Sequence, residues 1–380
     1  MKVTVHDSIS DITATDWNRV APSAYPFLRH EFLNAAEQTG CVAPQQGWTP
    51  RHLTIGSRGH VRAAMPLYEK SHSWGEFVFD WAWANAYQQA GFSYYPKLVS
   101  AVPFTPAPCR KLLLADPLDT DAAHALLGAA ITLADESNCS SLHILFPHAD
   151  EIALLQSADL LVRKDCQFHW HNRGYGSFDE FLLTFTSAKR KKARRDRRRI
   201  EEQGIRFRRL KGGEMTAADW SVVYELISHT FLQRGSLPYF NEAFFRSISR
   251  ELADNILVIL AEKEDKTVAA AVFFESERVL YGRYWGSDGH YDALHFETCY
   301  YQGIDYCIDT GKQVFEPGTQ GEHKISRGFS PETTWSAHWL AHPEFADAIS
   351  RYLDEESRHV DRYMDAVDSR SPYKAREDEL

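Results

Sequence analysis

The chain has 380 residues, of which 44% are hydrophobic and 25% charged, and its formal net charge is -10. This composition is ordinary for a folded globular protein, and the length favours two domains over a single core. No run of eighteen apolar residues occurs, and the six scattered cysteines form no Cys-x-x-Cys pair; this argues against a membrane-spanning helix, a disulfide framework and a structural zinc site, and predicts a cytoplasmic protein.

The first half of the chain reads as strands followed by a helix and a further strand. Apolar and β-branched residues predict strands at 51–55, 61–68 and 77–80. A helical pattern then runs from Trp81 to Ala90 and stops at Gly91. A last strand at 97–102 leads into a proline-rich segment.

The second half shows the same order of elements. Strands are predicted at 256–261, 267–274 and 279–285. A helix follows from about Leu294 to Asp309, because its apolar positions recur every four residues along one face. The strand 313–316 closes this half.

Further elements are predicted between and after the two halves. Helices are expected at 122–137 and 177–203, with a strand at 141–146. The apolar spacing after Pro343 predicts an amphipathic closing helix. The charged residues 369–380 predict a disordered tail.

The repeated order predicts an α/β fold with mixed sheets, built from two related domains. A meander that leads into a helix and a returning strand is how the GNAT acyltransferase fold is built, although such meanders also occur elsewhere. We therefore predict two tandem GNAT-like domains, residues 1–165 and 166–340, the second including a basic helix at 188–203. Residues 341–380 form the closing helix and the charged tail.

The basic helix gives the chain a strong charge asymmetry. From Lys189 to Lys211 there are thirteen basic and three acidic residues, which gives this segment a net charge of +10. Because the whole chain has a net charge of -10, the remaining residues together carry -20. Like charges four residues apart repel each other in a helix, and an anionic partner such as tRNA relieves that repulsion. The alternatives are pairing with the acidic surface of the chain itself and binding to lipid headgroups. The predicted nucleic-acid contacts are Lys191, Arg194, Arg195 and Arg198.

The segment from Glu316 to Phe329 holds the densest group of ionisable residues in a loop broken by proline and glycine. Such loops at the ends of strands commonly carry active sites. Lys324 and Arg327 are suited to stabilise an oxyanion or a phosphate, and His323 or Glu322 to move a proton. The alternative interpretation is an ion-paired surface loop.

Several motifs between Asp80 and Trp339 resemble the FemAB-like N-acyltransferases. In the second half they are Gly282–Gly286, Leu294–Tyr301, and Gly318–Lys324 with Arg327–Phe329; in the first they are Phe79–Tyr87 and Tyr94–Leu98 with Val102–Pro106. A further motif is His169–Asn172.

The resemblance implies an activity and a central residue. The FemAB-like family is related to the FemA, FemB and FemX peptidyltransferases, which carry two GNAT-like domains and take aminoacyl groups from aminoacyl-tRNA. It implies transfer of an acyl or aminoacyl group to the amine of a small molecule or peptide. Lys324, placed before Arg327-Gly328-Phe329, matches a lysine that contributes to the reaction centre of those relatives.

The acyl donor stays open between aminoacyl-tRNA and acyl-CoA, and no tightly bound cofactor is expected. Acyl-CoA-dependent GNAT proteins usually carry an Arg/Gln-x-x-Gly-x-Gly/Ala loop whose amides hold the pyrophosphate, and neither half shows it. In the first half Asp80 is expected to cap the helix with a carboxylate, where a phosphate would lie. The longer junction 286–292 of the second half leaves room for an anion.

The remaining candidates complete the predicted site. Glu297 is expected to act as a general base or to pair with Arg283. His169 and His171 lie on one face of a strand, but no third ligand accompanies them, so no metal site is predicted. The catalytic candidates are Lys324, His323 and Glu297, and the substrate-binding candidates are Asp80, Trp83, Tyr87, Arg283, Tyr284, Trp285, Tyr301, Glu316, Gln320 and Arg327.

A second function class stays open at this point. The missing CoA loop is also compatible with a non-catalytic protein that binds RNA or an envelope precursor on an acyltransferase scaffold. The charged loop speaks against it, because a binding protein has no need of His323 beside Lys324.

Overall fold

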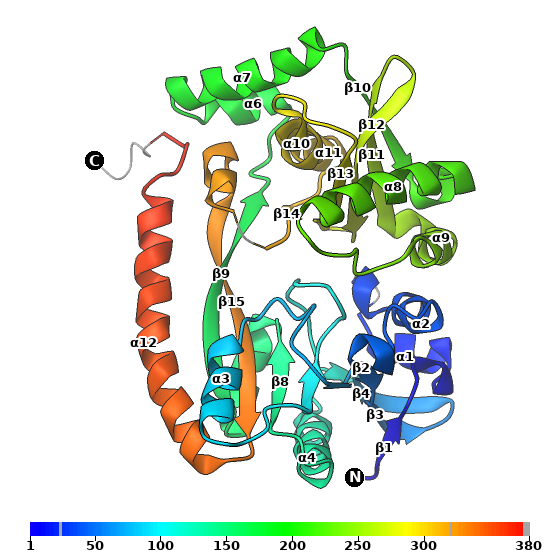
Figure 1. The fold of residues 1–380 in the computed structure, drawn as a ribbon, viewed down its shortest axis with the longest axis vertical. Coiled ribbons are helices and arrows are strands. Elements are labelled where there is room, and N and C mark those ends of the chain that lie inside the picture. Colours follow the sequence, from blue (N-terminus) through cyan, green and yellow to red (C-terminus); the bar gives the residue numbers. More distant parts are fainter. Residues whose placement is uncertain (23–24, 320, 375–380) are drawn as a thin grey trace. The chain divides into compact units, whose positions relative to one another are not determined.

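The computed structural model describes residues 1–22, 25–319 and 321–374. It divides into two compact units, each drawn with its elements in Figure 1. Unit 1 comprises residues 1–165 and 333–361, and unit 2 comprises 166–332 and the residues from 362 onward. The units describe packing, and the division into domains at 1–165, 166–340 and 341–380 stays a prediction.

Unit 1 contains two sets of strands. One set is antiparallel in the order β1, β3, β4, β7, and the other runs in the order β15, β8, β6, β5, β2, with β6 and β8 parallel. Because a helix must connect parallel neighbours, a crossover lies between β6 and β8. The strands are β1 (Val3–His6), β2 (Trp48–Pro50), β3 (His52–Ser57), β4 (His60–Met65), β5 (Tyr68–Lys70), β6 (Lys97–Ser100), β7 (Leu113–Leu114), β8 (Ser141–Leu145) and β15 (Ser330–Leu340).

The helices of unit 1 cover its strands. The crossover helix α4 (Thr120–Glu136) packs Leu126 and Leu127 into a core with residues of β3, β4, β6 and β8. A separate core joins α3 (Trp81–Gln89) to the first part of α12 (Pro343–Asp368). The remaining helices are α1 (Ala14–Val20), α2 (His30–Gln38) and α5 (Ile152–Ser157).

Two expectations for unit 1 were wrong. Residues 77–80 form no strand, and Phe77 has a φ of 61°, outside the extended region. The helix that joins the parallel strands is α4, whereas α3 belongs to the segment 71–96 between β5 and β6. The helix of the first half that corresponds to the helix at 294–310 is therefore α4, and α3 has no counterpart in the second half.

Unit 2 contains a mixed set of strands in the order β10, β11, β12, β13, β14, β9. Neighbours from β10 to β13 are antiparallel, β13 and β14 are parallel, and β14 is antiparallel to β9. The strands are β9 (Leu161–His171), which begins in unit 1, β10 (Arg206–Lys211), β11 (Ile256–Lys263), β12 (Lys266–Glu275), β13 (Val279–Ser287) and β14 (Val314–Glu316).

A bulge and a divergence lie on β13. Val272 of β12 pairs with Tyr284 and Phe273 with Gly282, so Arg283 is an extra residue in β13. The parallel pairing of β13 with β14 is confined to Val279–Tyr281, after which β13 continues and β14 ends. The pairing of the two strands therefore ends at Tyr281 and Glu316, next to the bulge residue Arg283.

Helices cover both faces of the unit 2 strands. On one face α8 (Ala217–Gln233) approaches β13 so closely that a Cβ on Gly286 would lie 2.1 Å from the carbonyl carbon of Leu226. The other face carries an aromatic core that includes residues of α6 and of the helix at 294–310. The helices are α6 (Phe178–Leu183), α7 (Ser187–Glu202), α8, α9 (Glu242–Glu251), α10 (Leu294–Phe296), a π-helical turn Glu297–Tyr301 and α11 (Gln302–Thr310).

The sequence predictions for unit 2 were right for β11, β12, β13 and β14, missed β10, and were incomplete for the helices. The predicted helix 177–203 is two helices, because buried Phe185 lies in the break between α6 and α7. The tail was predicted to be disordered, but Tyr373 packs on Phe185 at 5.3 Å between ring centroids; residues 375–380 lie outside the described part. In the described part of the chain, no helix is long and apolar enough to cross a membrane.

Candidate functional site

The loop after β14 turns back on itself around Lys324. This residue lies in a 3-10 helix, Glu322–Arg327, and is 2% exposed. Its Nζ donates hydrogen bonds to the carbonyl oxygens of Gly318 at 2.7 Å and Thr319 at 2.9 Å. The loop can close tightly because Gly328 has a φ of 92°, and a Cβ there would lie 2.7 Å from the Phe181 ring. Gln320, predicted to bind substrate, lies outside the described residues.

The environment of Lys324 disfavours its charge. No carboxylate of the described residues lies within ion-pair distance of its ammonium group. Burial, and then the positive charge of Arg283, lower the pKa of Lys324 to about 7. A lysine that is part protonated near neutral pH can both donate and accept a proton, which is unusual for this side chain.

Arg283 and Glu316 lie together at the divergence of β13 and β14. The Arg283 Nη2 atom is 4.0 Å from Glu316 Oε2, and its Nη1 donates to the carbonyl oxygen of Gly282 at 2.8 Å. Glu316 Oε2 is buried and accepts no hydrogen bond within the described structure. Burial raises the pKa of Glu316 to about 7, against the opposing effect of Arg283. The charge of Arg283 thus acts on two other predicted residues, lowering the pKa of Lys324 and opposing the rise in the pKa of Glu316.

The two strand histidines lie beside this group. His171 Nε2 is 2.7 Å from Glu332 Oε1. Burial lowers the pKa of His169 to about 4, so its imidazole is neutral at physiological pH. Among the residues that the structure describes, no three His, Cys, Asp or Glu side chains form a group able to hold a metal ion.

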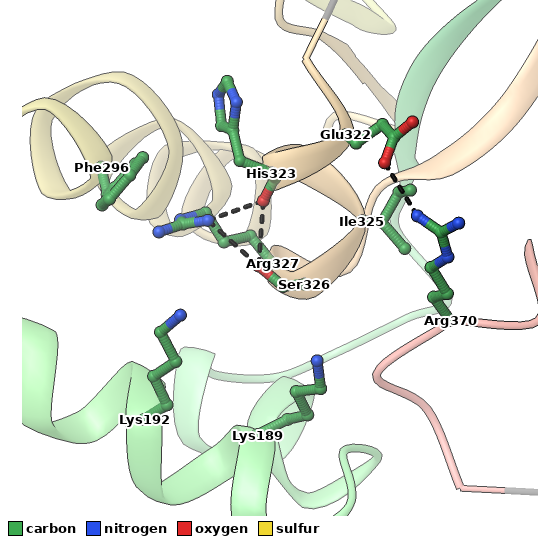
Figure 2. Close-up of a pocket in the computed structure, with 9 residues that line it drawn as sticks. All are labelled: Lys189, Lys192, Phe296, Glu322, His323, Ile325, Ser326, Arg327 and Arg370. Atoms are coloured by element: carbon green, nitrogen blue, oxygen red, sulfur yellow. Dashed lines mark hydrogen bonds and ion pairs between the residues drawn. The ribbon is translucent and has the colours of Figure 1, made fainter. Parts of the chain in front are cut away.

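His323 and Arg327 belong to the side of the loop that faces α7. His323 Nε2 is 2.8 Å from the Tyr300 hydroxyl oxygen, and burial, then Arg327, lower the pKa of this histidine. Arg327 is 3% exposed, donates to the carbonyl oxygen of His323 at 2.6 Å and lies 3.4 Å above the Phe296 ring. These side chains line a pocket of about 390 Å³, drawn in Figure 2.

One of the two expectations for Glu297 was a pair with Arg283, and this was wrong: the glutamate pairs with Arg197. Its Oε1 lies 3.1 Å from Arg197 Nη2 and accepts a hydrogen bond from Gln302 at 2.8 Å. Arg197 also binds Asp305 at 2.6 Å. Burial raises the pKa of Glu297. Glu297 is the first residue of the π-helical turn, and its ion pair with Arg197 connects this turn to α7.

The aromatic candidates of unit 2 are chiefly core residues. Tyr284 is buried, and its ring centroid lies 5.3 Å from that of Phe245 in α9. Tyr301 is buried 5.6 Å from the Phe178 ring. Trp285 packs against His295 at 5.3 Å on the other face of β13. Burial lowers the pKa of His295 to about 4.

The first-half candidates lie in unit 1 and form a separate polar cluster. Asp80 precedes α3 but makes no capping hydrogen bond, contrary to the prediction. Its Oδ2 instead binds the Lys97 ammonium group and accepts a hydrogen bond from the Tyr94 hydroxyl at 2.7 Å. The Lys97 ammonium group attracts the Asp80 carboxylate more strongly than the backbone amides of α3 do, because the buried ammonium has no water to solvate it.

Trp83 and Tyr87 hold α3 on the core of unit 1. The Trp83 ring lies 4.8 Å from that of His338, and Tyr87 stacks on Phe345 at 3.9 Å. Both side chains are buried, Tyr87 completely. The structure therefore places Asp80, Trp83 and Tyr87 in a different compact unit from Lys324.

Lys97 is the polar residue that the sequence argument missed. It is 0% exposed, and its Nζ donates to Glu76 Oε2 and Ser73 Oγ, each at 2.8 Å, besides binding Asp80. Burial alone would lower its pKa, but the two carboxylates outweigh burial and raise it. A lysine at the start of an apolar strand, downstream of Glu76 and Asp80, was the available signal.

Of the predicted contacts of α7 with nucleic acid, Arg194 is ion-paired within unit 2 and the others are solvated. Arg194 Nη2 lies 3.0 Å from Asp179 Oδ1. Lys191, Arg195 and Arg198 are exposed and have no ion pair among the described residues. The helix also has an inner face, on which its buried residues Ala193, Asp196 and Ile200 lie.

Comparison with known proteins places the chain. A family model called FemAB-like, described as peptidoglycan biosynthesis/recognition, matches residues 8–375. The chain belongs to this family. No curated protein matches it.

Solved structures share the fold at low sequence identity. FemX is 12% identical, with a TM-score of 0.54, over 92% of this chain and 100% of that one. The C-terminal domain of a protein assigned as a lysylphosphatidylglycerol synthetase from Agrobacterium fabrum is 9% identical, with a TM-score of 0.53, over 90% and 95%. L-PGS from Bacillus licheniformis is 13% identical, with a TM-score of 0.50, over 85% and 96%. The FemAB-like chain thus has the tandem GNAT-like α/β fold.

The region matched by the family model includes two of the buried lysines, Lys97 of unit 1 and Lys324 of unit 2. It also spans α7 and the whole of α12.

Proposed function

We propose that this FemAB-like protein transfers an acyl or aminoacyl group from an activated donor to an amine. The observation that carries the proposal is Lys324, a buried lysine bound to two carbonyl oxygens and, among the described residues, to no carboxylate. Family membership supports transfer chemistry, and the likeness to FemX and to L-PGS supports the fold on which it would occur.

The proposed reaction is a direct attack of the amine nitrogen on the acyl carbonyl carbon. The new carbon–nitrogen bond forms as the carbon–oxygen bond of an ester donor, or the carbon–sulfur bond of a thioester, breaks. Protonated Lys324 stabilises the oxyanion that develops and gives a proton to the leaving oxygen or sulfur. Its charge acts strongly there because the side chain is shielded from water.

Glu316 is the best-placed group to take the proton that the amine loses. Its Oε2 atom is buried without a hydrogen bond in the described structure, and its pKa of about 7 lets it exist as a carboxylate at neutral pH. Glu297 is held by Arg197 and Gln302, and His323 by Tyr300, so both other candidates already have partners. Arg283 would keep Glu316 ionised and orient it.

We propose aminoacyl-tRNA as the donor rather than acyl-CoA. The exposed cations Lys191, Arg195 and Arg198 of α7 offer phosphate contacts that a long anionic donor can reach. A pyrophosphate-binding glycine loop is missing at both strand-to-helix junctions of the sequence. A small-molecule or peptide amine would be the acceptor.

The test is transfer of a labelled aminoacyl group from a mixed pool of aminoacyl-tRNAs, or of an acyl group from acyl-CoA, to amines of a cell extract. We expect Lys324→Ala to lower transfer by at least about a hundred-fold, the usual loss of an oxyanion donor. Lys266→Ala, which removes an exposed lysine of β12, is the matched control and should stay active.

Full transfer by Lys324→Ala would remove the lysine from the mechanism. If neither donor pool gives a labelled product with the intact protein, the non-catalytic binding protein becomes the better account of the fold.

A further inference from the structure

The inner face of α7 presents two lysines to unit 2. Residues spaced three and four apart share one face of a helix. Ala193, Asp196 and Ile200 are buried on α7. Toward the start of the helix, half-buried Lys189 continues their stripe, and exposed Lys192 lies at its edge. Lys191 and Arg195 lie on the opposite, exposed face.

These two lysines reach a pocket. In Figure 2 both side chains extend from α7 toward the segment His323–Arg327. The pocket has a volume of about 390 Å³, within the range of small-molecule sites. Its lining combines basic groups with an apolar patch: Lys189, Lys192, Phe296, Glu322, His323, Ile325, Ser326, Arg327 and Arg370.

Positive charge dominates this lining. Glu322 is bound to Arg370 at 2.8 Å. Lys189, Lys192 and Arg327 have no carboxylate within ion-pair distance among the described residues. The carboxylate that acts on Arg327 from further away is that of buried Asp196. Burial lowers the pKa of the Arg327 guanidinium more than Tyr301 and Asp196 raise it, so the pocket favours a further negative charge.

Arg327 distinguishes this pocket from a merely charged surface, because its guanidinium is buried and held in a fixed position. Its side chain is 97% buried, the complement of its 3% exposure, and its Nε is without a hydrogen-bond acceptor in the described structure. The guanidinium is fixed on the Phe296 ring and on the His323 carbonyl oxygen. A fixed guanidinium with lysines opposite it is the donor arrangement that suits phosphate oxygens.

We infer that this pocket binds the phosphate group of a phosphate ester. Arg327 and the two lysines would contact the phosphate oxygens, and Phe296 with Ile325 would contact the organic part next to it. The inference concerns binding alone and does not depend on acyl transfer.

The experiment compares adenosine monophosphate with adenosine by isothermal titration calorimetry, because the two probes differ in the phosphate. The intact protein should bind the monophosphate at least about ten-fold more tightly, since hydrogen bonds to charged groups contribute most to such a difference. Lys189→Gln with Lys192→Gln should abolish most of this preference. Arg206→Gln with Lys266→Gln removes the same charge from exposed residues of β10 and β12 that do not line the pocket, and should leave the preference unchanged.

Equal affinities for the two probes, or equal losses in both double variants, would overturn the inference. Competition by CoA or by a short RNA ending in CCA then assigns the phosphate ester to one source or the other. Loss of phosphate binding with intact acyl transfer distinguishes this site from the reaction centre at Lys324.

Discussion

Two buried lysines, one in each unit, have opposite surroundings. Lys97 in unit 1 is bound by Glu76 and Asp80, and its pKa is raised. Lys324 in unit 2 contacts carbonyl oxygens and lies near Arg283, and its pKa is lowered to about 7. The same burial thus gives a permanent, paired charge at Lys97 and an adjustable charge at Lys324; in unit 1, burial also lowers the pKa of Lys70 to about 7. Lys97 is suited to hold structure, and Lys324 to do chemistry.

The largest expected effect is on stability, at Lys97. Lys97→Met leaves two buried carboxylates without their cation, and removing one partner of a buried pair costs about 3–5 kcal/mol of the free energy of unfolding. Lys324→Met removes a poorly solvated amine and leaves no acid behind, so it should not destabilise the protein. Urea unfolding followed by circular dichroism at pH 7 measures both variants.

The pH dependence of unfolding gives the matching control. The pKa of Lys324 is about 7 in the folded chain against its ordinary value of 10.5, so the unfolded state binds more protons between these values. Stability therefore rises from pH 7 toward pH 10.5, and the penalty below pH 7 amounts to about 5 kcal/mol at most. Lys324→Met should lose its share of this slope and keep the share of Lys70, whose pKa burial also lowers to about 7, whereas Lys97→Met should keep both; the reverse result would exchange the roles of Lys97 and Lys324.

A moderate effect is expected in the pH profile of transfer. The proposed mechanism needs Glu316 ionised and Lys324 protonated, and both groups have a pKa of about 7. The rate should therefore rise with pH as Glu316 ionises and fall as Lys324 loses its proton, giving a bell centred near pH 7. Lys324→Arg keeps its charge and should lack the alkaline limb, whereas Glu316→Gln should lack the acid limb. A wild-type profile that is flat from pH 6 to pH 8 would contradict these roles.

The smallest effect on stability is expected for the solvated cations of α7. Replacing Lys191, Arg195 and Arg198 by Gln removes like charges four apart and should change the free energy of unfolding by only a few tenths of a kcal/mol. The same variant should weaken tRNA binding and reduce its log-log salt slope by about one for every phosphate that the protein no longer neutralises. A stability loss above about 1 kcal/mol would show that these cations are held by the fold.

The sequence was informative where periodicity and local breaks decide the structure. The strands β11, β12, β13 and β14 and the helix at 294–310 follow the predicted order, since their apolar residues fill the core of unit 2. The pattern of 77–80 was misleading, because Phe77 and Val78 pack against the core cluster of Val99 and Phe146 instead of joining a sheet. The helices α8 and α9 were not predicted at all.

The site was predictable in its residue types and less so in its partners. The density of charge between Glu316 and Arg327 pointed to the loop, but the pairing of Glu297 with Arg197 depends on the packing of α7 against a π-helical turn that lies far along the chain. The grouping of Arg283 with Glu316 depends on the bulge in β13. Long-range pairings of this kind leave no local signal in one sequence.

Gly286 sets a limit on how unit 2 can adapt to a ligand. Because β13 meets the backbone of α8 at this residue with no room for a Cβ, the helix is seated directly on the strand. Because no side chain lies between β13 and α8 at this contact, the two elements cannot shift against each other by repacking side chains. β13 and α8 should therefore move together as one rigid body when unit 2 binds a ligand.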